Sequence, residues 1–113
     1  MERDIVKAIV RSAKASGWWT MKIHGGPYQP AGIPDLLCVK DGKAVWLEVK
    51  QPGKKASAIQ LQRIAEIREQ SGAPCYVVTS REEADVCLRV HSHDSRRRAV
   101  DPIVDQCERR AGL

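Results

Sequence analysis

Residues 32–50 constrain the fold more than any other part of this chain, because they carry a strong β-hairpin signal. Two apolar segments rich in strand-forming residues, 36–40 and 43–49, flank the dipeptide Asp41-Gly42. Asp-Gly between such segments is typical of a two-residue hairpin turn. The sequence therefore predicts two antiparallel strands joined by this turn.

A two-residue turn also fixes the register of the hairpin. Lys40 then faces Lys43, and Asp35 faces Glu48 at the open end. Facing Cβ atoms lie about 4.5–5.5 Å apart, and like charges there are destabilising. Lys50 lies two positions after Glu48 and shares its face. A hard divalent cation such as Mg²⁺ would offset the repulsion, because it prefers carboxylate oxygens; the alternative is an exposed hairpin end in which Lys50 neutralises one acid.

Length and composition favour one domain with a nucleic-acid partner. The 113 residues suffice for a single core, and the formal net charge of +5 favours a polyanionic partner without proving one. Because the chain has neither a long apolar run nor a signal-peptide pattern, we expect it to be cytoplasmic and not in a membrane. We expect the widely spaced cysteines to be free thiols: Cys38, Cys75, Cys87 and Cys107.

Residues 3–16 predict an amphipathic helix that ends at Gly17. Its apolar positions follow helical spacing: Ile5, Val6, Ile9, Val10 and Ala13. Glu2 would lie on the inward side at the start of this helix, where it could simply complement the helix dipole. Residues 18–24 then predict a strand rich in aromatic and β-forming side chains.

The long connection at 25–32 has the composition of a binding loop. Gly25 would allow backbone to approach a phosphate closely, and Tyr28 could stack on a base or sugar. Lys22 and His24 share a face of the preceding strand and point toward this loop. The alternatives are a solvated lysine, a partly buried histidine and a flexible turn.

After the hairpin, residues 51–55 form a polar break that contains Lys54 and Lys55, which suit a nucleic-acid backbone or a solvated loop. Ser57 can cap a helix that runs to about residue 70. Gln60 shares the inward stripe of this helix, where its amide needs hydrogen-bond partners. The apolar members of the stripe are Leu61, Ile64 and Ile67.

Residues 74–79 form a continuous apolar segment, as expected of a strand buried on both faces. Because a helix precedes it, a crossover connection would place it parallel to the strand of Glu48. Residues 81–90 suggest a last helix.

The C-terminal part gives weaker signals. Zinc ligation by the group at 91–94 together with Cys87 is disfavoured, because the spacing fits no standard ligand set. Arg96–Arg98 and Arg109–Arg110 indicate a basic arm that binds phosphates or stays disordered. We therefore expect a domain at 1–92 and a basic extension at 93–113.

The residues at the hairpin end resemble a known motif. Ile33-Pro34-Asp35 followed by Glu48-Val49-Lys50 looks like the PD-(D/E)XK nuclease motif. Together with the helix-borne Glu2 and Ser57-x-x-Gln60, the chain from about residue 2 to 80 resembles the VRR-NUC branch of that superfamily, in its small stand-alone phage form. One departure is Lys22, which stands where relatives typically have arginine.

The resemblance implies an α/β fold, with an αβββαβ restriction-endonuclease-like core and a mixed sheet of about four strands flanked by helices. It implies Mg²⁺, replaceable by Mn²⁺, held by Asp35, Glu48, the Val49 carbonyl and Glu2. It also implies that Lys50 and Gln60 take part in catalysis. No small-molecule cofactor is expected.

The implied activity is metal-dependent hydrolysis of phosphodiester bonds in DNA, often at branched, flapped or Holliday-junction-like structures. Because cutting two strands requires two active sites, we expect a homodimer. Two alternatives stay open. One is a nucleic-acid-binding module of the same fold without catalysis, and the other is an interaction domain whose acids are only a surface cluster.

Overall fold

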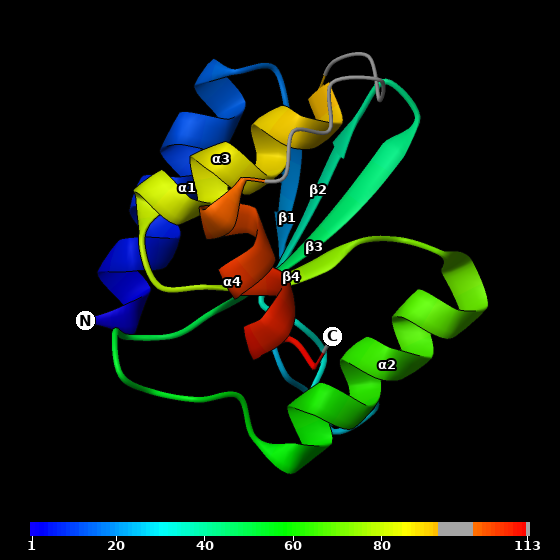
Figure 1. Ribbon diagram of the computed structural model, residues 1–113. Coiled ribbons are helices and arrows are strands. Elements are labelled where there is room, and N and C mark those ends of the chain that lie inside the picture. The colour runs from blue at the N-terminus through cyan, green and yellow to red at the C-terminus, as the bar shows by residue number, and fades with distance from the viewer. Residues whose placement is uncertain (93–100, 113) are drawn as a thin grey trace.

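A four-stranded mixed sheet organises the protein, and helices pack on both of its faces (Figure 1). The computed structural model describes residues 1–92 and 101–112. In chain order the elements are α1 (Glu2–Ala15), β1 (Trp19–Lys22), β2 (Leu36–Lys40), β3 (Lys43–Val49), α2 (Ala58–Ser71), β4 (Cys75–Val78), α3 (Arg81–Ser92) and α4 (Pro102–Arg110). The predicted α/β class and αβββαβ order are confirmed.

The strands lie in the order β1-β2-β3-β4, with β4 parallel to β3 and the other pairs antiparallel. The predicted hairpin turn is present: Lys40 pairs with Lys43 and Leu36 with Leu47. Asp41 and Gly42 both have positive φ, 51° and 77°, as a turn that matches the twist of the strands requires. The expected parallel crossover to β4 is also confirmed.

The two faces of the sheet have separate cores. On one face α1 and α3 pack against even-numbered residues of β2 and odd-numbered residues of β3; this core includes Ile9, Leu36, Cys38, Val45, Leu47, Val49 and Leu88. On the other face α2 packs through Ile64 and Ile67 against Cys75, Val77 and Trp46. The helix α2 therefore sits over β3 and β4 on this face.

Local signals account for most boundaries. Ser57 caps α2 through its side chain, and Gly72 ends the helix in the left-handed region at φ 72°. All four residues of β4 are buried, as its continuous apolar run predicts. β1 is shorter than the predicted strand at 18–24, although the hydrogen bond from Ile23 N to Asp35 O (2.8 Å) continues its pairing with β2.

The helix α4 was not predicted. Residues 101–112 were expected to belong to a basic arm, yet Val104 and Cys107 are buried against the sheet and α3. Arg110 lies 2.7 Å from Glu83 of α3, so this arginine stabilises the fold instead of extending into solvent. Arg96–Arg98 lie outside the described residues.

The four cysteines are free and buried, as expected. Within residues 1–92 and 101–112, none of the helices has the length and apolar character needed to cross a membrane.

Candidate active site

The open end of the β2–β3 hairpin brings two carboxylates together. One step beyond the Leu36–Leu47 pair, the register sets Asp35 opposite Glu48. The Val49 N–H donates a hydrogen bond of 2.8 Å to Asp35 Oδ2, which holds that side chain against β3. After burial, the charge of Asp35 is the largest effect that raises the pKa of Glu48, as expected of two nearby acids. The two acids therefore lie on the same face.

Glu48 is almost fully buried, with 1% of its surface exposed. Its Oε2 accepts a hydrogen bond from Gln60 Nε2 (3.1 Å) and lies 3.6 Å from Lys50 Nζ. Burial and then the charge of Asp35 raise the pKa of Glu48 to about 8, against the lowering effect of Lys50; Glu2 adds a smaller raising effect. Without a further cation, this site therefore favours a protonated Glu48 at neutral pH.

Gln60 is held in place by the cap of α2. Its Oε1 accepts from Ser57 N (2.8 Å), while Ser57 Oγ accepts from Gln60 N (3.3 Å). This reciprocal pair is a capping box. Because the amide oxygen is engaged by a backbone N–H, the amide nitrogen is left to donate to Glu48. The cap of the helix thus orients a site residue.

The loop before Asp35 is fixed to α2 by two contacts that the sequence did not reveal. Gly32 has φ +81°, and a Cβ there would lie 2.7 Å from Ile59 O and 3.1 Å from Gln60 N. Arg63 Nε donates to Ala31 O (2.9 Å). The only sequence signal was a glycine three positions before Asp35, since Arg63 lies on no motif.

The carboxylates of Asp35 and Glu48 suit a hard divalent cation, because one of their buried oxygens lacks a hydrogen-bond partner in the described part of the chain. Glu48 Oε1 is buried and has no hydrogen-bond partner among the described residues, and buried polar atoms normally have one. A cation between Asp35 and Glu48 would satisfy this oxygen and oppose the repulsion between the acids. Within the described ranges no three His, Cys, Asp or Glu side chains are grouped to hold a metal. Two carboxylates, the Val49 carbonyl and water would then complete the shell.

Glu2 starts α1 and affects Glu48 electrostatically, but it does not form a three-carboxylate group with Asp35 and Glu48. His91 bonds to Tyr76 OH at 2.6 Å, while residues 93 and 94 lie outside the described part.

The residues predicted to contact substrate are all exposed to solvent. Lys22 is exposed and pairs with Leu36, which places it on the α1 face, opposite to the face of Asp35. His24 and Gly25 follow β1 in an exposed segment, and Tyr28 is 98% exposed. The remaining two, Lys54 and Lys55, are exposed between β3 and α2.

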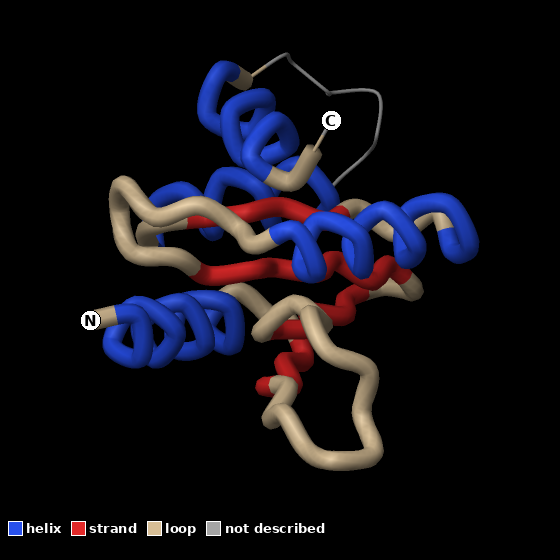
Figure 2. The backbone as a smooth tube through the Cα atoms, turned by 90° about the horizontal axis from the view of Figure 1, so that it is seen from below, coloured by secondary structure: helices blue, strands red, loops and turns tan. Residues whose placement is uncertain are grey.

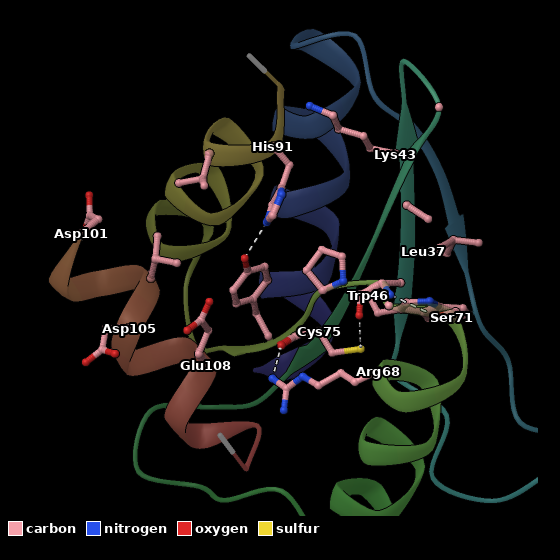
Figure 3. Close-up of a pocket in the computed structure, with 18 residues that line it drawn as sticks. Leu37, Lys43, Trp46, Arg68, Ser71, Cys75, His91, Asp101, Asp105 and Glu108 are labelled. Atoms are coloured by element: carbon pink, nitrogen blue, oxygen red, sulfur yellow. Dashed lines mark hydrogen bonds between the residues drawn. The ribbon is translucent and has the colours of Figure 1, made fainter. Parts of the chain in front are cut away.

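A surface cavity of about 1050 Å³ lies elsewhere, lined by the turn end of the β2–β3 hairpin, the end of α2, the start of β4, the end of α3 and one side of α4 (Figure 3). Its lining includes Trp46, Arg68 and Glu108 but neither Asp35 nor Glu48. Arg68 points from α2 to the Cys75 carbonyl at 2.6 Å, which ties the cavity wall to β4 (Figure 3). The cavity is therefore separate from the carboxylate pair.

Comparison with known proteins supports this architecture. No family model and no curated protein matches the chain. Among solved structures, one described as a VRR_NUC domain superposes with a TM-score of 0.66 at 27% identity, covering 78% of this chain and 94% of that one. The Hjc Holliday junction resolvase of Archaeoglobus fulgidus superposes with a TM-score of 0.54 at 18% identity, covering 66% of this chain and 64% of that one.

The sheet order, the helices on both faces and the paired acids at the hairpin end define a protein with the restriction-endonuclease-like nuclease fold. The resemblance to the VRR-NUC family of the PD-(D/E)XK superfamily, which the sequence predicts, is confirmed by the superposition.

Proposed function

We propose that this protein is a divalent-metal-dependent DNA endonuclease that cuts branched, flapped or Holliday-junction-like DNA. One observation carries the proposal: Asp35 and Glu48 meet on one face beside Lys50 and Gln60, and the buried Glu48 has an unpartnered oxygen. The structural neighbours, a VRR_NUC domain and a Holliday junction resolvase, support the choice of DNA and of branched structures.

In this proposal Asp35, Glu48 and the Val49 carbonyl hold Mg²⁺, and Mn²⁺ can replace it. When bound there, such an ion would supply Lewis-acid chemistry, which would polarise the scissile phosphate and lower the pKa of the attacking water. Gln60 keeps Glu48 oriented through its 3.1 Å hydrogen bond. Among the described residues Glu2 forms no three-carboxylate group with Asp35 and Glu48, and we assign it to holding a water beside the ion that these acids would bind.

Lys50 contributes positive charge next to the reacting water. Its Nζ lies 3.6 Å from Glu48 Oε2, and its side chain keeps 15% of its surface exposed. We assign it to orienting the water and stabilising the added negative charge, while solvent or phosphate accepts the proton.

Substrate contacts come from exposed groups around this end of the sheet. We assign Tyr28 to stacking and His24, Lys54 and Lys55 to phosphates, with Gly25 allowing close backbone approach. Lys22 approaches the DNA from the α1 side of the sheet. A single small domain covers little of a branched substrate, and two cuts need two sites, so we propose a homodimer that acts in the cytoplasm.

The test combines metal binding with cleavage. Mn²⁺ titration by calorimetry is compared for the unaltered protein, Asp35→Asn and the matched control Asp41→Asn, which changes an exposed acid at the other end of the same hairpin. We expect binding to be lost only in Asp35→Asn. The same three proteins are then given a four-way junction and a linear duplex of equal length, with Mg²⁺ or EDTA.

Junction cleavage that needs metal and Asp35 supports the proposal. Metal and junction binding without cleavage in any divalent ion would indicate the non-catalytic binding module. Equal Mn²⁺ binding in Asp35→Asn and Asp41→Asn would refute the metal site.

A further inference from the structure

The two edge strands of the sheet, β4 and β1, differ in the contacts that their outer sides make. Along β4, the outward carbonyls of Cys75 and Val77 accept hydrogen bonds from Arg68 (2.6 Å) and Arg110 (3.4 Å). The helix α4 also packs along this edge (Figure 2). At the other edge, no strand in the described part of the chain pairs with the outer side of β1. An open strand edge is a template for pairing with another chain.

On the face that carries Asp35, the side chains of this edge strand are apolar. Trp19 is 58% exposed and Met21 41% exposed, and Ile23 follows them at the same alternation. They lie on the face that carries Asp35 and Glu48, since odd-numbered residues of β1 pair with odd-numbered residues of β2. We call Trp19, Met21 and Ile23 the β1 seam. Exposed tryptophan and methionine of this kind mark protein contact surfaces.

The backbone of β1 restricts how another strand can pair with it. Ile23 N–H donates to Asp35 O, so odd-numbered residues point their polar backbone groups toward β2. By alternation, Thr20 and Lys22 point theirs outward. The N–H of Trp18 is already donated to Ala13 O at 3.0 Å. The groups offered at the edge are therefore those of Thr20 and Lys22.

We infer that the partner at this edge is a second copy of the chain, paired antiparallel through β1 with a two-fold axis at Met21. Thr20 of each copy then faces Lys22 of the other, and both residues exchange N–H and C=O hydrogen bonds. The register that sets Thr20 against Thr20 would require the Trp18 N–H, which is engaged. Trp19 faces Ile23 of the second copy, an aromatic–β-branched pair. The inference names the surface of the proposed homodimer and so rests on the proposed function.

This pairing has a consequence for the carboxylate pairs. A two-fold axis perpendicular to the sheet keeps both pairs on the same face. With strands about 4.8 Å apart and a rise of about 3.3 Å per residue, the two sites lie roughly 20–25 Å apart. A single dimer could then cut a branched substrate at two positions on the same side.

The first experiment measures molar mass by light scattering at tens of micromolar protein. We expect the unaltered chain to show twice its 12.6 kDa. Met21→Lys, which sets two like charges face to face on the axis, should run as a monomer. The control Ile103→Lys changes a residue of similar exposure (38%) on α4 and should remain dimeric. A monomeric unaltered chain, or a dimer that survives Met21→Lys, would overturn the inference.

The second experiment tests the register and does not depend on a destabilised variant. With oxidised glutathione as oxidant, two Met21→Cys thiols form one disulfide while glutathione disulfide is reduced to two thiols. Facing residues of a non-hydrogen-bonded antiparallel pair have Cα atoms about 4.5 Å apart, within disulfide range. The control Thr20→Cys should not crosslink, because its side chain lies on the other face and is offset from its symmetry mate. The natural cysteines are buried.

Crosslinking of Thr20→Cys instead of Met21→Cys would overturn the stated register. Mn²⁺ titration of the monomeric Met21→Lys protein separates this inference from the proposed function. If the unaltered chain is a monomer and Mn²⁺ still binds, only the inferred dimer contact through the β1 seam is refuted. If the chain is a dimer that binds no metal, only the proposed nuclease site is refuted.

Discussion

Replacing Glu48 by glutamine should stabilise the metal-free protein, and increasingly so as the pH rises. Glutamine has nearly the same shape and can still accept the hydrogen bond from Gln60. It carries no charge, so the repulsion from Asp35 and the cost of burying a carboxylate both disappear. The structure thus predicts that a residue of the candidate site opposes folding when no cation is present.

The sign follows from the pKa of Glu48, which rises from 4.5 in the unfolded chain to about 8 in the fold. The folded state then binds a proton that the unfolded state has released, so the unaltered protein is favoured below pH 4.5 and loses stability as pH rises to about 8. At about 1.4 kcal/mol per pH unit, the loss is roughly 3 kcal/mol by pH 7 and roughly 4 kcal/mol by pH 8. Glu48→Gln does not lose this stability.

The assay is urea unfolding in EDTA at several pH values from 4.5 to 8.5, for the unaltered protein and Glu48→Gln. The two proteins share all other titrating groups. Subtracting one free energy of unfolding from the other therefore isolates the contribution of Glu48. We expect this difference to grow in favour of Glu48→Gln as the pH rises. The control Glu69→Gln alters a solvent-exposed carboxylate and should give a nearly constant difference.

Saturating Mn²⁺ should reverse the order, because an ion bound to the folded state stabilises it by mass action. The unaltered protein gains stability from Mn²⁺, while Glu48→Gln gains little. A difference between the two proteins that stays flat from pH 5 to 8 in EDTA would refute the reasoning about Glu48.

Three further substitutions test the surroundings of the site. Gly32→Ala should destabilise by about 2–4 kcal/mol in urea and weaken Mn²⁺ binding, because its φ of +81° and the α2 backbone 2.7 Å away leave no room for a Cβ. Ser57→Ala should cost about 1 kcal/mol through the lost cap, and calorimetry should show weaker Mn²⁺ binding as Gln60 loses its anchor. Arg110→Ala should destabilise by about 2 kcal/mol at pH 7. Although burial acts to raise the pKa of Glu83, hydrogen bonds from Arg110 and Thr79 lower it overall, so the cost should shrink as the pH falls below 4.5. An unchanged unfolding curve for any of the three would contradict its assigned contact.

The sequence was informative where interactions are local. The Asp-Gly turn fixed the hairpin register, and with it the meeting of Asp35 and Glu48, because the side-chain period of a strand is two and the turn sets the count. Ser57 predicted the start of α2 through local capping chemistry, and the structure adds Gln60 as the second member of the capping box. The continuous apolar run of β4 predicted its burial for the same local reason.

The contacts between distant segments were visible only in the folded chain. The fit of Gly32 against α2, the bond from Arg63 to the loop and the packing of α4 each join elements far apart in the sequence. The C-terminal arginines looked like a basic arm, but Arg110 pairs with Glu83 because the fold brings α4 beside α3.

The sequence by itself thus determined which acids face each other, because a tight turn counts residues in pairs. Only the tertiary structure decided that Glu48 is buried with one oxygen unpartnered, since burial depends on where α2 crosses the sheet. It also decided that α4 covers the edge of β4 while, within residues 1–92 and 101–112, no strand pairs with the outer edge of β1, because the packing of α4 depends on contacts between distant segments.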